Sequence, residues 1–188
     1  MKNYSENSFD NKIDFLKNEL WILAWNASVQ RANLYKKTND EEKNEFKCLI
    51  KTYIEKDILK HYQGNNCTEE RHYKNLSALV NYGNEIAGNK ILKDKYRYGI
   101  AQKLLNLYLK YLWCIKLIHT PPHCPIDRII INKLKLKCNW TQINDEKYYR
   151  RIIEKIKKTI KLDEEHSPNE SIAEWELKVY SRRNLKKT

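Results

Sequence analysis

The chain has 188 residues, of which 41% are hydrophobic and 32% are charged, so it is long enough to bury one substantial core. No apolar run approaches the roughly 20 residues of a membrane span, and the first ten residues lack the apolar stretch of a secretory signal. Thirty-six Lys and Arg against 24 Asp and Glu give a net charge of +12. This excess favours a polyanionic partner, most commonly nucleic acid, although a general enrichment in lysine explains it as well.

The cysteines argue against a secreted, disulfide-stapled domain. There are five, irregularly spaced, in a chain too large to need such bonds, which fits free thiols in a reducing compartment. We therefore expect a monomeric protein of the cytoplasm, associated with the nucleoid and not with a membrane.

Helical periodicity dominates the chain. Only four glycines and four prolines interrupt it, so we expect an all-α fold. In chain order, the expected helices cover residues 7–37, 40–62, 69–88, 96–118 and 126–137, followed by one within 139–161 and one within 167–183. The first is one helix, or two that break near Asn26, and its apolar stripe consists of Ile13, Leu16, Leu20, Leu23 and Ala27.

Local signals predict where these helices begin and end. Asp40 is placed to cap the second helix, and Gly88 and Asn89 to stop the third. Pro168 and Ser171 are placed to start the last one.

The helix over 96–118 is the most apolar and is expected at the centre of the fold. Gly99, Lys103, Asn106 and Lys110 recur along one side of it and form a polar seam. Desolvation, neighbouring cations and the helix dipole would each disfavour the ammonium form of Lys103, which favours a nucleophilic amine. The alternative is a surface lysine whose charge reaches solvent.

A proline-rich crossing follows this helix. The stretch HTPPHCP, residues 119–125, holds three of the four prolines within five residues. Because proline fixes its own φ and keeps the preceding residue extended, the crossing should be stiff and should deliver Asp127 to one defined place opposite Lys103. A carboxylate at a helix start is either a simple cap or a catalytic group on a rigid support.

The segment YGIAQKLLNLYLKYLWCIKLIHTPPHCPIDRIII resembles the helix-hairpin-helix superfamily of DNA glycosylases, most closely its archaeal 8-oxoguanine branch. The resemblance covers about residues 97–134. It implies a two-lobed helical fold with an atypical hairpin and an interlobe cleft, a duplex DNA partner and no cofactor. In that family a lysine attacks C1′ of the nucleotide and forms a Schiff base that permits strand cleavage, while an aspartate stabilises charge and handles protons. By motif, these are Lys103 and Asp127.

The resemblance also has departures. The hairpin glycines of the family are missing except for Gly99, which puts the usual phosphate grip of the hairpin in doubt. No cysteine quartet follows, so the iron–sulfur cluster of some members is absent. We expect one domain over 1–188 with two lobes, approximately 30–118 and 1–29 plus 119–188.

Further site residues follow from the resemblance and from the basic side chains. The stretches AWNASVQRA and SIAEWEL occupy the places of a base-reading glutamine and a pocket tryptophan, which implies a base pocket. The expected pocket residues are Gln30, Trp25, Trp175 and Asn106. The expected DNA contacts are Arg97, Lys110, Arg128, Lys133, Lys135 and the basic helix KYYRRIIEKIKK.

Several alternatives stay open. Asp127 could activate water in a glycosylase that lacks lyase activity, or the chain could be a non-enzymatic, basic, helical module that binds nucleic acid. The target base could be oxidised guanine or a modified base carried by an invading genome, which would imply a role in defence. Four zinc-type ligands also lie close together in sequence, although their spacing is not that of a standard finger. They are Cys114, His119, His123 and Cys124.

Overall fold

The computed structural model describes residues 4–88, 90–162 and 170–180, with the backbone alone for residues 4–10. Within these ranges the chain is helical and has no β-strand, which confirms the predicted all-α class. The α-helices are α1 (Tyr4–Val29), α2 (Asp40–Tyr53), α3 (Glu69–Ala87), α4 (Tyr98–Cys114), α5 (Arg128–Lys133), α6 (Glu146–Leu162) and α7 (Ile172–Val179). A π-helical turn, η1 (Ile54–Ile58), and two 3₁₀ turns, η2 (Leu59–Tyr62) and η3 (Trp140–Gln142), complete the described helical elements. None of the helices in these ranges is long and apolar enough to cross a membrane.

Several helices begin or end at the capping residues predicted from the sequence. Gly88, with φ of 50°, ends α3 as predicted, because its conformation is one that side chains with a Cβ disfavour. Ser171 caps α7 in a reciprocal capping box. Asp40 was the wrong choice of cap for α2. The side chain of Asn39 accepts the backbone N–H of Glu42 at 2.8 Å, which makes Asp40 the first helical residue.

Several predicted helices differ from the observed ones in length or type, and α4, for example, ends at Cys114 rather than at residue 118. α1 runs unbroken through Asn26 and ends at Val29. The helix predicted over 40–62 is α-helical only to Tyr53 and continues as η1 and η2. α5 ends at Lys133, because the backbone turns into the left-handed region at Lys135, with φ of 55°. The predicted signals Asn89 and Pro168 lie outside the described residues.

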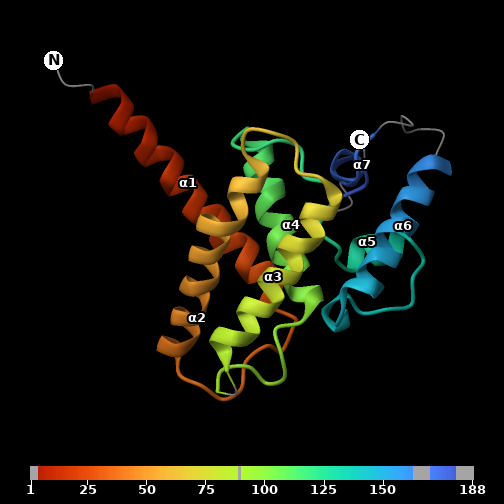
Figure 1. Cartoon of the computed structure of the whole chain (residues 1–188), viewed down its shortest axis with the longest axis horizontal. Helices are drawn as coiled ribbons and strands as arrows, with labels where there is room; N and C mark the ends of the chain where they lie inside the picture. The colour runs from red at the N-terminus through yellow and green to blue at the C-terminus, as the bar shows by residue number, and fades with distance from the viewer. Residues whose placement is uncertain (1–3, 89, 163–169, 181–188) are drawn as a thin grey trace, which may run out of the picture.

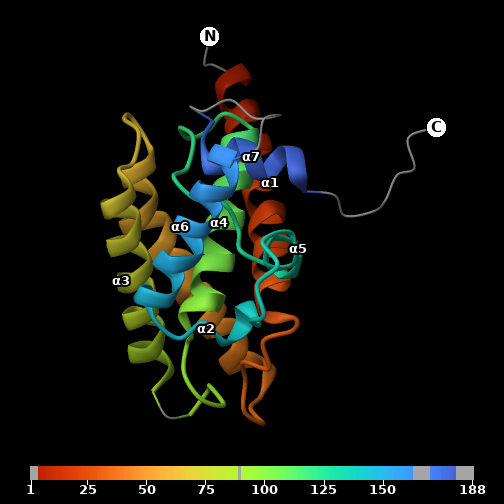
Figure 2. The same ribbon diagram turned by 90° about the vertical axis from the view of Figure 1, so that its right-hand side faces the viewer.

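α4 lies at the centre of the fold, as predicted. Nearly every side chain from Tyr98 to Leu109 is buried, and α1, α3, α6 and η3 all pack directly against this helix. In Figure 1, α2 stands on one side of the molecule, α3 crosses the middle in front of α4, and α5, α6 and α7 gather on the other side. The quarter turn to Figure 2 places α4 between α3 and α6 on one side and α1 and α5 on the other.

The side of α1 that faces the core is shifted from the predicted stripe, of which Leu20 and Ala27 still pack against the core. Trp21, Ala24 and Trp25 are buried against α4, and the ring of Trp21 meets Tyr108 edge-on at 5.5 Å between centroids. Leu23, a member of the predicted stripe, is 50% exposed. The helix carries two adjacent apolar stripes, and the one with the two tryptophans buries the larger surface.

The proposed division into two lobes stays a prediction. α1 belongs to the predicted lobe of 1–29 plus 119–188, yet it packs along α4 of the other lobe. One hydrophobic core cluster takes residues from both.

Candidate active site

Lys103 and Asp127 meet as the sequence predicted. Nζ of Lys103 lies 2.9 Å from Oδ2 of Asp127, and the two side chains are only 7% and 15% exposed. Lys103 comes from the second turn of α4, and Asp127 ends the proline-rich crossing. The pair therefore joins two segments that are 24 residues apart in the chain. Its catalytic role stays a prediction.

Asp127 also caps α5 with its second oxygen. Oδ1 accepts the backbone N–H of Ile129 at 2.8 Å and that of Ile130 at 3.2 Å. The cap fixes the rotamer of the carboxylate, so that Oδ2 is left to face Lys103. One side chain can therefore act both as the helix cap and as the rigidly held carboxylate that the sequence suggested as alternatives.

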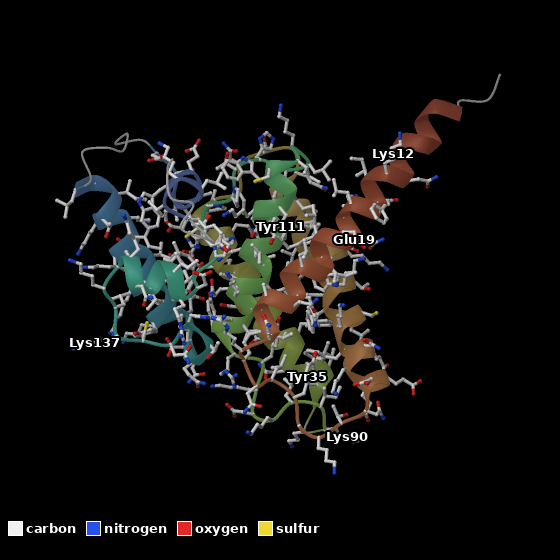
Figure 3. All side chains as sticks on the ribbon, turned by 180° about the vertical axis from the view of Figure 1, so that it is seen from behind. Lys12, Glu19, Tyr35, Lys90, Tyr111 and Lys137 are labelled. Carbon is white, nitrogen blue, oxygen red and sulfur yellow. The ribbon has the colours of Figure 1, made fainter. Side chains whose placement is uncertain are left out.

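The pair lies in the wall of a cavity of about 610 Å³. The end of α1, one face of α4, the crossing, α5, η3 and α7 surround this cavity, and these elements lie together in Figure 2. Figure 3 labels one lining residue, Tyr111, which extends from α4 beside α1. The lining residues are Ala27, Gln30, Arg31, Lys103, Leu107, Lys110, Tyr111, Pro125, Asp127, Arg128, Ile129, Asn132, Trp140, Glu176 and Tyr180. A volume of this size is typical of sites that enclose a small ligand.

A second ion pair lies in the same cavity, two turns farther along α4. Nζ of Lys110 contacts Oε2 of Glu176, with the side chains 12% and 2% exposed. The same ammonium lies 4.6 Å from the centre of the Tyr180 ring. Burial raises the pKa of Glu176, and the bond to Lys110 opposes that shift. Lys110 was predicted as a DNA contact, and its ammonium is paired with Glu176 in the cavity.

Only one of the four predicted base-pocket residues lines this cavity. Gln30 does, from the end of α1. Trp25 and Trp175 are core residues, 4% and 0% exposed. Asn106 is also buried, and its amide donates to the carbonyl of Cys124 and to the hydroxyl of Tyr149. The last three side chains form the support of the site rather than its surface, because their helices turn them toward the core.

The predicted DNA contacts divide in a similar way. Arg128 is exposed at the cavity, and Lys133 and Lys135 are exposed beyond it. Arg97 is only 6% exposed and donates to the backbone carbonyls of Thr141 and Ala32. It therefore joins three segments of the fold and does not reach a surface ligand.

Three charged or aromatic residues line the cavity without having been predicted from the sequence, namely Arg31, Glu176 and Tyr180. A signal for Glu176 was present, because a carboxylate in the short helix SIAEWEL sits beside a core tryptophan and needs a cationic partner. No local pattern singled out Arg31.

The four candidate zinc ligands do not come together. Cys114 is exposed on one end of α4, whereas Cys124 is buried, and burial raises the pKa of its thiol. His123 is enclosed by the hydroxyl of Tyr149 and the carboxylate of Glu69, each at 3.0 Å. Across the described ranges, no group of three or more His, Cys, Asp or Glu side chains is arranged to hold a metal ion. The zinc alternative is therefore wrong for these residues.

The chain matches no protein-family model, no curated protein and no solved structure. The resemblance to DNA glycosylases therefore stands on the motif within residues 97–134 alone.

Proposed function

We propose that the protein is a DNA glycosylase that flips a damaged or modified base out of duplex DNA and cleaves its N-glycosidic bond. One observation carries the proposal. The Lys103–Asp127 pair lies in the wall of a cavity of about 610 Å³, which is also lined by two arginines that have no ion-pair partner among the described residues. An extruded nucleotide would place its sugar at this pair, where an amine and a carboxylate can act together.

The two side chains supply complementary steps. Lys103 must first lose a proton to solvent, because an ammonium has no lone pair for attack, and Asp127 keeps its negative charge in this step. Its amine then bonds to C1′ as the C1′–N bond breaks, and the base leaves with the bonding electrons and takes up a proton. Opening of the sugar ring gives an imine between Lys103 and C1′, which permits strand cleavage. Asp127, fixed by its cap, stabilises the positive charge that develops on the sugar.

The charge of the cavity fits a nucleic acid. Two of its four cations, Lys103 and Lys110, are matched by carboxylates. Arg31 and Arg128 also line the cavity, and neither forms an ion pair with the rest of the described chain. These two guanidinium groups are suited to the phosphates that flank an extruded nucleotide.

The far end of the cavity offers a place for the base. Residues seven apart on an α-helix are separated by about 10 Å, so Lys110 and its partner Glu176 lie beyond the point where the sugar would meet Lys103. The pair presents a donor and an acceptor to the edge of a base, and the Tyr180 ring lies beside them.

The direct test is borohydride trapping on duplexes that carry oxidised, deaminated, alkylated, hypermodified or abasic sites. We expect a covalent protein–DNA adduct with wild type that is lost in Lys103→Gln and kept in Lys74→Gln, a control that removes one exposed lysine of α3 away from the cavity. Alkali-labile abasic sites without an adduct would indicate a water-using glycosylase centred on Asp127. No product on any duplex would contradict the proposal.

One observation favours a second candidate, a non-enzymatic nucleic-acid-binding module. The cap on α5 and the ion pair with Lys103 already give Asp127 two structural roles. In a module, Lys103→Gln and Asp127→Asn would change stability alone. In a glycosylase, both variants would bind DNA and fail to form product.

A further inference from the structure

The end of the proline-rich crossing is bound to α4 by a buried amide. Gln102 is 0% exposed. Its Nε2 donates to the carbonyl of Ile126 at 2.8 Å, and its Oε1 accepts the N–H of the same residue at 3.0 Å. Nε2 also donates to the carbonyl of Gly99 at 3.0 Å. One side chain thus satisfies both backbone polar groups of Ile126, the residue immediately before Asp127.

A second amide, one turn along α4, holds the same segment. Nδ2 of Asn106 donates to the carbonyl of Cys124 at 3.0 Å and lies 3.3 Å from Oε1 of Gln102. Cys124 and Ile126 alternate along the extended crossing, so their backbone groups can face the same helix. The bonds of Gln102 to Gly99 and Ile126 fix which end of its amide donates and which accepts, and Nδ2 of Asn106 lies beside the accepting end.

Asn106 is itself held from the other side. Its Nδ2 donates to the hydroxyl of Tyr149 at 3.0 Å, and this hydroxyl lies 3.0 Å from Nδ1 of His123. Burial lowers the pKa of His123. In the neutral imidazole, Nε2 donates to Glu69 and Nδ1 accepts from Tyr149, which continues one chain of hydrogen bonds from α3 through α6 to α4.

From this geometry we infer that Gln102 is a positioning residue for Asp127. The inference rests on the proposed function and deepens it. Gln102 immediately precedes Lys103 on α4, and Ile126 immediately precedes Asp127 on the crossing. The hydrogen bonds between Gln102 and Ile126 therefore hold Asp127 at the position where it meets Lys103. The prolines make the crossing stiff, and the amide fixes where it lies.

The chemistry of the contact requires an amide. A peptide group presents a carbonyl and an N–H, and only a side chain with both a donor and an acceptor pairs with the two at once. A thioether of equal length leaves both groups of Ile126 buried without partners. The crossing is then free to move, and a displacement of about 1 Å at a reacting group costs on the order of 10²-fold in rate.

The test compares Gln102→Met with Gln142→Met, the same change at an exposed glutamine. We expect Gln102→Met to lower the single-turnover rate of base excision roughly 10²-fold while the Kd for uncut duplex changes little, because Arg31 and Arg128 are untouched. Amide hydrogen exchange at Ile126 should accelerate in the same variant. Gln142→Met should change neither quantity.

The outcomes separate this inference from the proposed function. If wild type excises a base and Gln102→Met does so at the same rate, Gln102 does not position Asp127. If wild type yields no product on any duplex, the proposed function fails, and unchanged exchange protection at Ile126 would overturn the anchoring role as well. If Gln102→Met does not fold, Asn106→Ser keeps the bonds of Gln102 to Ile126 and should give a smaller loss of rate at unchanged Kd. A rate equal to wild type in Asn106→Ser would contradict the inference.

Discussion

The substitution Gly99→Ala tests how the site is packed. Gly99 lies in the first turn of α4, and its N–H donates to the carbonyl of Ile143 at 2.8 Å. A Cβ at this position would lie 1.9 Å from the backbone oxygen of Trp140 and 3.1 Å from its carbonyl carbon. Trp140 belongs to η3 and lines the cavity. The glycine therefore permits two backbones to touch beside the site.

The cost follows from the geometry. The contact must open by about 1 Å, and the neighbour is a backbone atom rather than the tip of a flexible side chain. Overpacking of this kind costs about 1–3 kcal/mol. Loss of the hydrogen bond from Gly99 to Ile143 destabilises the fold by roughly another 1 kcal/mol. The higher helix propensity of alanine stabilises it by about 1 kcal/mol, so these two effects cancel. The net loss is about 1–3 kcal/mol, or a Tm lower by roughly 2–12 °C for a chain of this length.

Thermal unfolding of wild type and Gly99→Ala measures this loss. The control is Gly64→Ala. Gly64 has φ of 81° but nothing within 4 Å of an added Cβ, so it carries only the backbone strain of about 1–2 kcal/mol. A Tm for Gly99→Ala equal to that of wild type would refute the close-approach argument. Because Gly99 has no positive φ, backbone strain of the kind present at Gly64 cannot account for a Tm loss in Gly99→Ala.

Three further predictions concern pH, DNA binding and the core. A hydrogen bond from His123 lowers the pKa of Glu69 from its ordinary value of 4.5 to about 2. The stability that the ionised Glu69 side chain contributes is therefore complete above about pH 4.5 and is lost as the pH falls to about 2. Urea unfolding across this range should show the difference between wild type and Glu69→Gln shrinking as pH falls, and a constant difference would contradict it. Arg31→Ala and Arg128→Ala should each flatten the slope of log Kd against log salt by about 1; unchanged slopes would remove them from the DNA interface. Trp25→Ala should cost about 3–5 kcal/mol in chemical unfolding without changing which base is excised, and a changed preference would place this side chain in the pocket.

Much of the fold could be predicted from the sequence because the local signals agree with one another. The helical period, the scarcity of glycine and the capping residues act within a few positions, so they need no knowledge of tertiary contacts. The meeting of Lys103 and Asp127 was also predictable. A lysine on the polar seam of the central helix and a proline-stiffened return leave few other places for the carboxylate.

The remaining details depend on contacts between distant segments. α1 carries two apolar stripes, and periodicity alone does not decide which of them meets α4. Trp25 and Trp175 looked like pocket residues because aromatic rings stack on bases, but the same rings are the largest apolar surfaces available to a core. Arg97 and Asn106 looked like ligand contacts because polar side chains are mostly exposed. Both instead satisfy buried backbone carbonyls.

Asp127 shows why a cap and a catalytic group are not exclusive assignments. A carboxylate has two oxygens, and α5 uses only Oδ1. The cap therefore orients Oδ2 toward Lys103 at no cost to the ion pair. Removal of the whole side chain would confuse the two roles, whereas Asp127→Asn keeps an oxygen for the cap and loses only the charge. The hydrogen bonds of Gln102 fix the backbone next to Asp127, and the cap on α5 fixes the rotamer of its side chain. Both sets of bonds help to place Oδ2, and neither involves Lys103.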